Sequence, residues 1–127
     1  ESFRLFGYHL GLAFQVQDDI LGIWGDEAKT GKSAASDLVE GKNSLPVLYA
    51  LEKRGTFFER WKKGPITTEE VKEVAEQLEV EGAKSFASEI ANSETQTALT
   101  YLKEANPQGE AGRSLLELAN MLLKRNQ

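Results

Sequence analysis

The sequence predicts an all-α protein, and three observations support this fold class. Apolar residues recur at helical spacings of three, four and seven, beginning with Leu5, Leu12 and Val16. The three prolines stand far apart and leave long stretches free to be helical. No segment shows the apolar–polar alternation of a half-buried β-strand. We therefore expect a partial helical bundle without a sheet.

The first expected helix runs from Phe3 to Trp24 and is apolar on most of its circumference. A helix of this kind belongs inside a larger assembly. The chain has no initiator Met, and the helical pattern is already present at Leu5. We therefore expect a piece of a longer protein, cut inside or just before a helix.

The segment from Gly25 to Asn43 has no apolar period and carries charges of both signs. We expect residues 26–43 to be mostly loop and poorly ordered without a ligand, and loops of this length are usually functional or disordered. The capping-box pair Thr67 and Glu70 predicts a helix start near residue 68. Further helices are expected over 44–54, 56–63, 68–79, 82–105 and 109–124.

Composition excludes several classes of function. The 127 residues suffice for one domain, and 40% hydrophobic with 28% charged side chains rules out a disordered chain. A net charge of -5 without a basic stripe argues against nucleic-acid binding. The absence of cysteine excludes a disulfide scaffold and a thiolate metal site, and it agrees with a reducing, cytoplasmic location. No apolar run is long enough for a transmembrane segment.

Two adjacent carboxylates, Asp18 and Asp19, are the only acidic residues of the first expected helix. Gln15 shares a helix face with them at spacings of three and four. Buried carboxylates need compensation, and Mg²⁺ takes one or two of them while it keeps substrate phosphate oxygens as other ligands. Taken alone, such a pair is more commonly a solvated helix face.

The following loop adds two lysines, Lys32 and Lys42, with Asp37 between them. A glycine-containing loop can bring ammonium groups over an anion, although lone loop lysines are more often solvated. Carboxylates for a metal followed at once by lysines for an anion form a more specific combination. Together they indicate a diphosphate bridged by magnesium.

The stretch from Phe14 to Leu51 resembles the C-terminal part of the trans-prenyl diphosphate synthases, the polyprenyl synthetase family. The family's second aspartate-rich motif is written FQxxDDxxD and is followed by GK, an aspartate and a GKxTLP-like segment. The matching residues are Phe14, Gln15, Asp18 and Asp19, then Gly31-Lys32, Asp37-Leu38, Gly41-Lys42 and Ser44-Leu45-Pro46.

The resemblance implies a role for each matching residue. Asp18 would be the main magnesium ligand, and Asp19 would act on the metal through water. Gln15 would form a hydrogen bond near the diphosphate, and Lys32 and Lys42 would form ion pairs with its oxygens. Asp37 would orient the loop or a metal-bound water. Phe14 would pack against the substrate cavity. Asp18, Lys32 and Lys42 would be the catalytic residues.

Two departures from the family pattern matter. Gly22 stands where the motif has its third aspartate, and we expect Gly22→Asp to have a modest effect of either sign on the rate and to lower the magnesium requirement. The first aspartate-rich motif is absent, because the chain has no second Asp-Asp pair. Residues 1–127 are therefore expected to be the C-terminal part of a single polyprenyl synthetase domain, and the chain alone is expected to be inactive.

The implied parent is a Mg²⁺-dependent prenyltransferase of isoprenoid biosynthesis that acts on isoprenyl diphosphates and forms a homo-oligomer, with a dimer as the expected state. The alternative is a non-catalytic regulatory or small subunit that binds a catalytic prenyltransferase partner. A terpene cyclase of the same architecture is a third reading, but the Gly31-Lys32 and Gly41–Pro46 segments argue against it.

Overall fold

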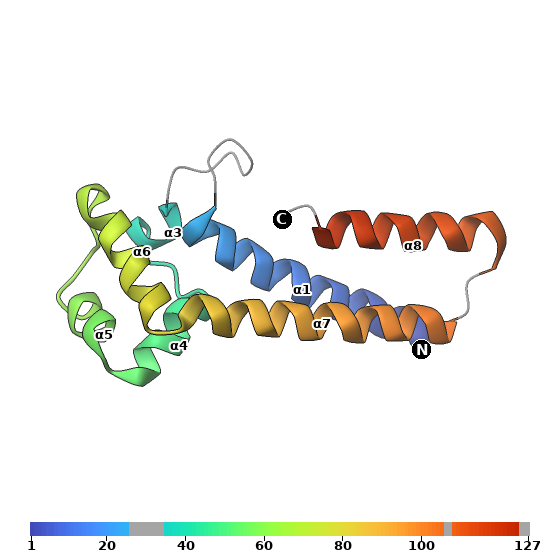
Figure 1. Ribbon diagram of the computed structural model, residues 1–127, viewed down its shortest axis with the longest axis horizontal. Coiled ribbons are helices and arrows are strands. Elements are labelled where there is room, and N and C mark those ends of the chain that lie inside the picture. The colour runs from blue at the N-terminus through green and yellow to red at the C-terminus, as the bar shows by residue number, and fades with distance from the viewer. Residues whose placement is uncertain (26–34, 106–107, 125–127) are drawn as a thin grey trace. The chain divides into compact units, whose positions relative to one another are not determined.

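The computed structural model describes residues 1–25, 35–105 and 108–124, and in these residues the only regular structure is helical. This confirms the all-α expectation. The elements in chain order are α1 (Ser2–Trp24), α3 (Ser36–Val39), α4 (Leu45–Lys53), α5 (Thr56–Trp61), the 3₁₀ turn η1 (Thr68–Glu70), α6 (Val71–Val80), α7 (Ala83–Ala105) and α8 (Gly109–Lys124), as Figure 1 shows. None of the helices in this part of the chain combines the length and apolar content needed to cross a membrane.

The chain divides into two compact units. The middle unit comprises Val16–Glu89, and the terminal unit comprises Glu1–Gln15 with Ile90–Gln127. The helices α1 and α7 each contribute residues to both units.

The middle unit packs its short helices around a core of large side chains. Leu38, Val47, Phe57 and Leu78 are at most 1% exposed and come from α3, α4, α5 and α6. The indole Nε1 of Trp24 donates a hydrogen bond to the carbonyl oxygen of Ala75 at 3.1 Å, which joins α1 to α6.

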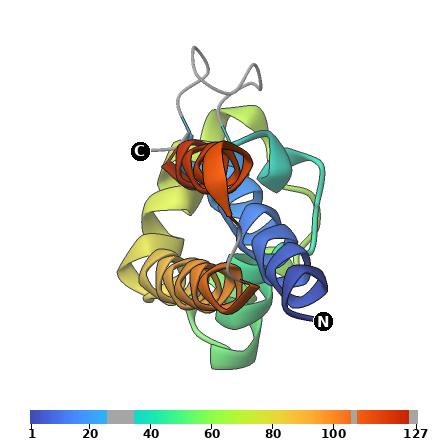
Figure 2. The same cartoon turned by 90° about the vertical axis from the view of Figure 1, so that its right-hand side faces the viewer.

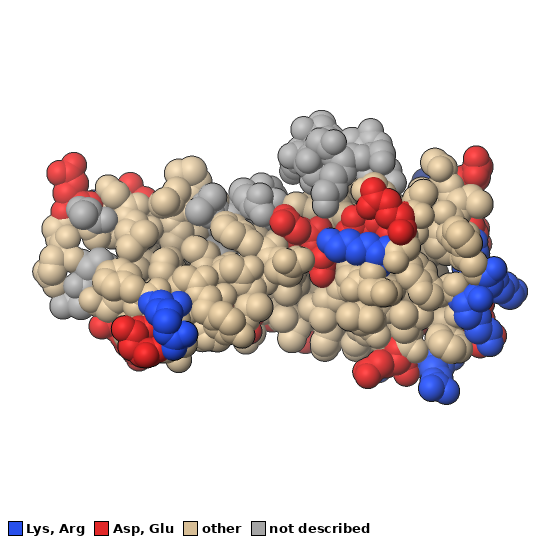
Figure 3. Space-filling view, turned by 180° about the vertical axis from the view of Figure 1, so that it is seen from behind, with Lys and Arg blue, Asp and Glu red and all other residues tan. Residues whose placement is uncertain are grey.

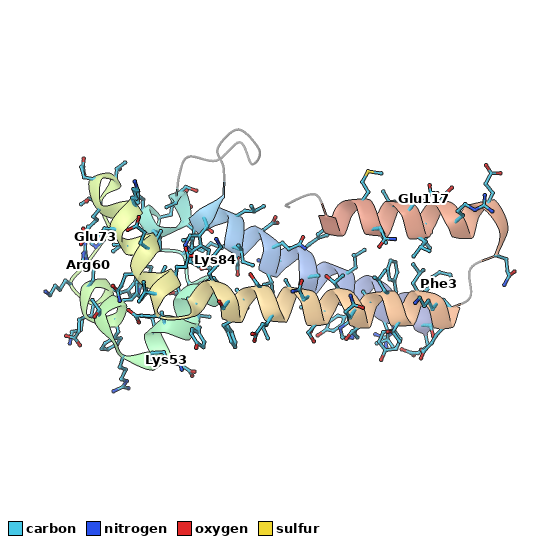
Figure 4. The ribbon with its side chains drawn as sticks, in the orientation of Figure 1. Phe3, Lys53, Arg60, Glu73, Lys84 and Glu117 are labelled. Carbon is cyan, nitrogen blue, oxygen red and sulfur yellow. The ribbon has the colours of Figure 1, made fainter. Side chains whose placement is uncertain are left out.

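Charged side chains also hold the middle unit together. Lys84, at the start of α7, places its ammonium 5.7 Å from the centre of the Trp24 ring (Figure 4). Arg60 on α5 pairs with Glu70 and also donates to the carbonyl oxygens of Gly64 and Pro65. This arginine therefore closes the turn between α5 and η1.

The terminal unit is built from the first half of α1, the second half of α7 and α8 (Figure 2). Its core is small and apolar, consisting of Phe6, Ala98, Leu102 and Ala119. His9 on α1 pairs with Glu94 on α7 through Nδ1 and Oε2 at 2.5 Å, and its ring stacks on Tyr101. The structure therefore gives His9 a packing role.

The predicted helices agree with the observed ones to within a few residues, with one correction. The expected loop contains α3, so the loop prediction is wrong for Ser36–Val39, while 26–34 lie outside the described residues. The physical reason is Leu38, which is fully buried and anchors a single helical turn too short to show a period. This turn fixes the backbone of Asp37 beside α1.

Candidate functional site

Asp19 links α1 to the start of α4. Its side chain is 6% exposed, and Oδ2 accepts a hydrogen bond from the backbone N–H of Leu45 at 3.0 Å. A carboxylate in this position complements the partial positive charge of a helix N-terminus. Ser44 is the N-cap residue of α4, but it makes no capping hydrogen bond, and its buried hydroxyl has no hydrogen-bond partner. Asp19 therefore caps the N-terminus of α4 in place of Ser44.

Lys42 lies between two buried carboxylates. Its Nζ is 3.2 Å from Asp19 Oδ1 and 3.7 Å from Asp37 Oδ2. The close contact with Asp19 raises the pKa of Lys42 above 10.5; burial opposes this shift, and the charge of Asp37 adds to it. The ammonium is therefore charged at neutral pH, and its side chain is still 40% exposed.

Asp37 packs directly against the backbone of α1 at Gly22. A β-carbon on Gly22 would lie 1.9 Å from Asp37 Oδ2 and 2.3 Å from its Cγ. Any side chain at residue 22 would thus have to displace the Asp37 carboxylate, which is 3% exposed. The modest effect of Gly22→Asp on the rate stays a prediction, but the substitution has to move the Asp37 carboxylate.

The cluster of Asp19, Asp37 and Lys42 unites three of the predicted site residues, and we call it the acid–lysine cluster. Asp18 is half-buried on the same helix as Asp19. Gln15 is exposed and Phe14 half-buried, but both belong to the terminal unit. Lys32 lies outside the described residues. The sequence did not predict the contact of Gly22 with Asp37 or the hydrogen bond from the Leu45 amide to Asp19. The glycine at an acidic motif position was the only signal for the first contact, and the second had none.

Acidic and basic side chains are interspersed on the face drawn in Figure 3, with wide uncharged areas between them. In the described part of the chain, no group of three or more carboxylate or histidine side chains is arranged to hold a metal ion. Instead, the Lys42 ammonium supplies the positive charge between Asp19 and Asp37.

Residues 1–78 match the family model described as polyprenyl synthetase. The chain belongs to the polyprenyl synthetase family. The match includes every residue of the acid–lysine cluster and ends within α6.

Known relatives carry the names of prenyl diphosphate synthases. The chain is 37% identical over 105 residues to the geranylgeranyl diphosphate synthase of Mycobacterium tuberculosis, which covers 79% of the chain and 30% of that protein. It is 54% identical over 46 residues to heptaprenyl diphosphate synthase component 2 of Geobacillus stearothermophilus, which is 36% of the chain and 14% of that protein. These names do not favour the alternative of a non-catalytic subunit.

The crystal structure of heptaprenyl diphosphate synthase from Staphylococcus aureus has the same fold. It superposes with a TM-score of 0.82 at 26% identity, over 97% of this chain and 39% of that chain. The fold resemblance therefore continues through the helices beyond residue 78. The chain spans well under half the length of the relatives that it matches.

Proposed function

We propose that the chain is the C-terminal part of a trans-prenyl diphosphate synthase, which joins an allylic isoprenyl diphosphate to isopentenyl diphosphate. The observation that carries this proposal is the acid–lysine cluster, in which α1, α3 and the turn before α4 bring two buried carboxylates to one ammonium. The names of the relatives supply the reaction class.

The donor atoms of the cluster fit magnesium. Asp19 Oδ1 and Asp37 Oδ2 are buried oxygens whose counter-ion is the Lys42 ammonium, and carboxylate oxygens are the hard ligands that Mg²⁺ prefers. We propose Asp18 as the main ligand and Asp19 as a ligand through water. When bound, Mg²⁺ would stabilise the negative charge of the diphosphate group.

In the proposed reaction the allylic C–O bond breaks and its electron pair leaves with the diphosphate. The double bond of isopentenyl diphosphate then attacks the allylic cation, and a proton is lost. Lys42 holds the two carboxylates in place and, being 40% exposed, can also donate to a diphosphate oxygen. This placement aims fixed positive charge at the group where negative charge develops.

We assign Lys32 a second ion pair with the diphosphate, Gln15 a hydrogen bond near it, and Phe14 a place beside the substrate cavity. The first aspartate-rich motif, which this chain lacks, would hold the other diphosphate contacts. The 127 residues alone therefore bind inorganic pyrophosphate in the presence of Mg²⁺ but do not form product.

Calorimetric titration of the chain with Mg²⁺ and inorganic pyrophosphate tests this proposal. Lys42→Met should weaken pyrophosphate binding by at least about tenfold, because a charge-assisted contact to the anion is lost. Lys62→Met is the matched control, since Lys62 makes an exposed ion pair with Glu59 at 3.0 Å. Equal binding by both variants would contradict the proposal. Turnover of radiolabelled isopentenyl diphosphate with farnesyl diphosphate by the chain alone would contradict its inactivity.

We also propose that the chain self-associates. The terminal unit exposes Phe3, Tyr8, Leu118 and Met121, which are 48–65% exposed. Exposed apolar side chains favour association, and homo-oligomers are the common result. Light scattering across a concentration series should show a mass above that of one chain, and a constant single-chain mass would contradict the proposal.

A further inference from the structure

Gly22 leaves a space in α1 that the Asp37 carboxylate fills. The distances of 1.9 Å and 2.3 Å from a β-carbon at residue 22 to Asp37 Oδ2 and Cγ are far below 3.0 Å, the lower limit for real β-carbon contacts. The Oδ2 atom is buried and has no hydrogen-bond partner, while the Lys42 ammonium lies 3.7 Å away. This carboxylate can take its present position only while residue 22 has no side chain.

Other glycines of the same helix show that this contact is specific. Gly7 and Gly11 also lie inside α1, but a β-carbon on either would meet no atom within 4 Å. Glycine weakens a helix interior, so each of these positions costs stability. Among these three glycines of α1, only Gly22 leaves a space that another side chain fills.

We propose that Gly22 is a positioning residue whose missing side chain seats Asp37 on the acidic face of α1. Residue 22 lies one helical turn after Asp18 and three residues after Asp19. The carboxylate that α1 lacks at this position is thus supplied by α3. The role of Asp37 at a metal site rests on the proposed function. The packing of Asp37 against Gly22 rests only on the distances given above.

Thermal melting of the chain in EDTA tests the packing. Gly22→Ala should lower the Tm by several degrees, although alanine favours a helix, and Gly11→Ala should not lower it. Adding Gly22→Ala to Asp37→Gly should cause no further loss, because the space is then empty. If Gly22→Ala melts at or above the wild type, or if the two losses add, the pairing is overturned. If Gly22→Ala alone does not fold, the double variant decides by comparison with Asp37→Gly.

Moving the carboxylate from residue 37 to residue 22 tests whether the pairing of Gly22 with Asp37 serves metal binding. Electron paramagnetic resonance of Mn²⁺, with inorganic pyrophosphate present, measures the binding of a magnesium substitute to the same chain. Asp37→Asn should weaken Mn²⁺ binding at least about tenfold, and the double variant Gly22→Asp with Asp37→Gly should recover it. A double variant as weak as Asp37→Asn overturns the assignment. If the wild-type chain binds no Mn²⁺, the metal part of the proposed function fails, and the melting comparison alone decides the pairing of Gly22 with Asp37.

Discussion

The two compact units differ in what they bury. In the described residues the buried polar and charged side chains are Asp19, Asp37 and Ser44, and all three belong to the middle unit. The core of the terminal unit is apolar, and its principal polar contact, between His9 and Glu94, is only half-buried. Burying charges costs free energy unless they are paired. The comparison indicates that the middle unit gives up stability to bury the charges of the acid–lysine cluster, while the core of the terminal unit serves packing.

The largest expected effect is on the catalytic rate, and it tests whether the middle unit carries the functional site. In the proposed full-length synthase, Asp18→Ala should lower the rate about a thousandfold, because the loss of the proposed metal contact in the transition state would remove several kcal/mol. A magnesium titration of the steady-state rate measures it, with the exposed Glu76→Ala as the control carboxylate. Wild-type rate and magnesium dependence in Asp18→Ala would show that Asp18 holds no catalytic metal.

The cost of the buried charges predicts a large effect on stability. Lys42→Met leaves Asp19 and Asp37 without their counter-ion, and we expect unfolding free energy to fall by about 2 kcal/mol, reduced from a fully buried pair by the exposure of the lysine. Urea denaturation measures this, and Lys62→Met should change it by less than about 0.5 kcal/mol. Because the pKa of Lys42 is raised, its contribution is present below pH 10.5 and is lost as pH rises through the higher folded value. Equal unfolding free energies of the two variants would show that Lys42 in the cluster contributes no more to stability than the surface residue Lys62.

A smaller effect is expected in the terminal unit. His9→Phe keeps an aromatic ring on Tyr101 but loses the contact with Glu94, and we expect a loss of about 1 kcal/mol in unfolding free energy. Pyrophosphate binding should stay unchanged, since His9 belongs to the unit without buried charges. Weakened pyrophosphate binding in this variant would give His9 itself a part in the site and contradict its packing role.

The smallest effect concerns a surface ion pair of the middle unit and depends on pH. Arg60, followed by the Thr67 backbone N–H, lowers the pKa of Glu70 to about 2. The stabilisation by Glu70 should therefore be fully present above pH 4.5 and be lost as pH falls toward 2. The Tm difference between wild type and Glu70→Gln should be constant from pH 7 to pH 4.5 and shrink below it. A difference that disappears already near pH 4 would contradict the lowered pKa.

Most of the fold was predictable because it is local. The capping box is formed, with the Thr67 N–H donating to Glu70 Oε1 at 2.9 Å, and α8 spans the predicted Gly109–Lys124. Helical periods and caps act over four residues, so they are visible in the sequence. The turn Ser36–Val39 was missed because its stability comes from Leu38 in a distant core, which leaves no period.

The site was predictable only as a set of residue types. The motif pattern named Asp19, Asp37 and Lys42, but it did not indicate that Lys42 would pair with both carboxylates. It also read Gly22 as a defect, while the structure shows contact with Asp37. Such tertiary contacts depend on how α3 packs against α1, and the spacing of residues along the chain does not predict this packing.

The start of α5 depends on a residue far along the chain. Phe57 donates its backbone N–H to Glu81 Oε2 at 2.9 Å, and Gln77 holds the same oxygen at 2.7 Å. A six-residue helix is too short to persist in water without tertiary support. During synthesis α5 must therefore wait until α6 has left the ribosome, although it precedes α6 in the chain. Since α6 has only 10 residues and also needs tertiary support, the two helices are expected to form together and not one by one as they are translated.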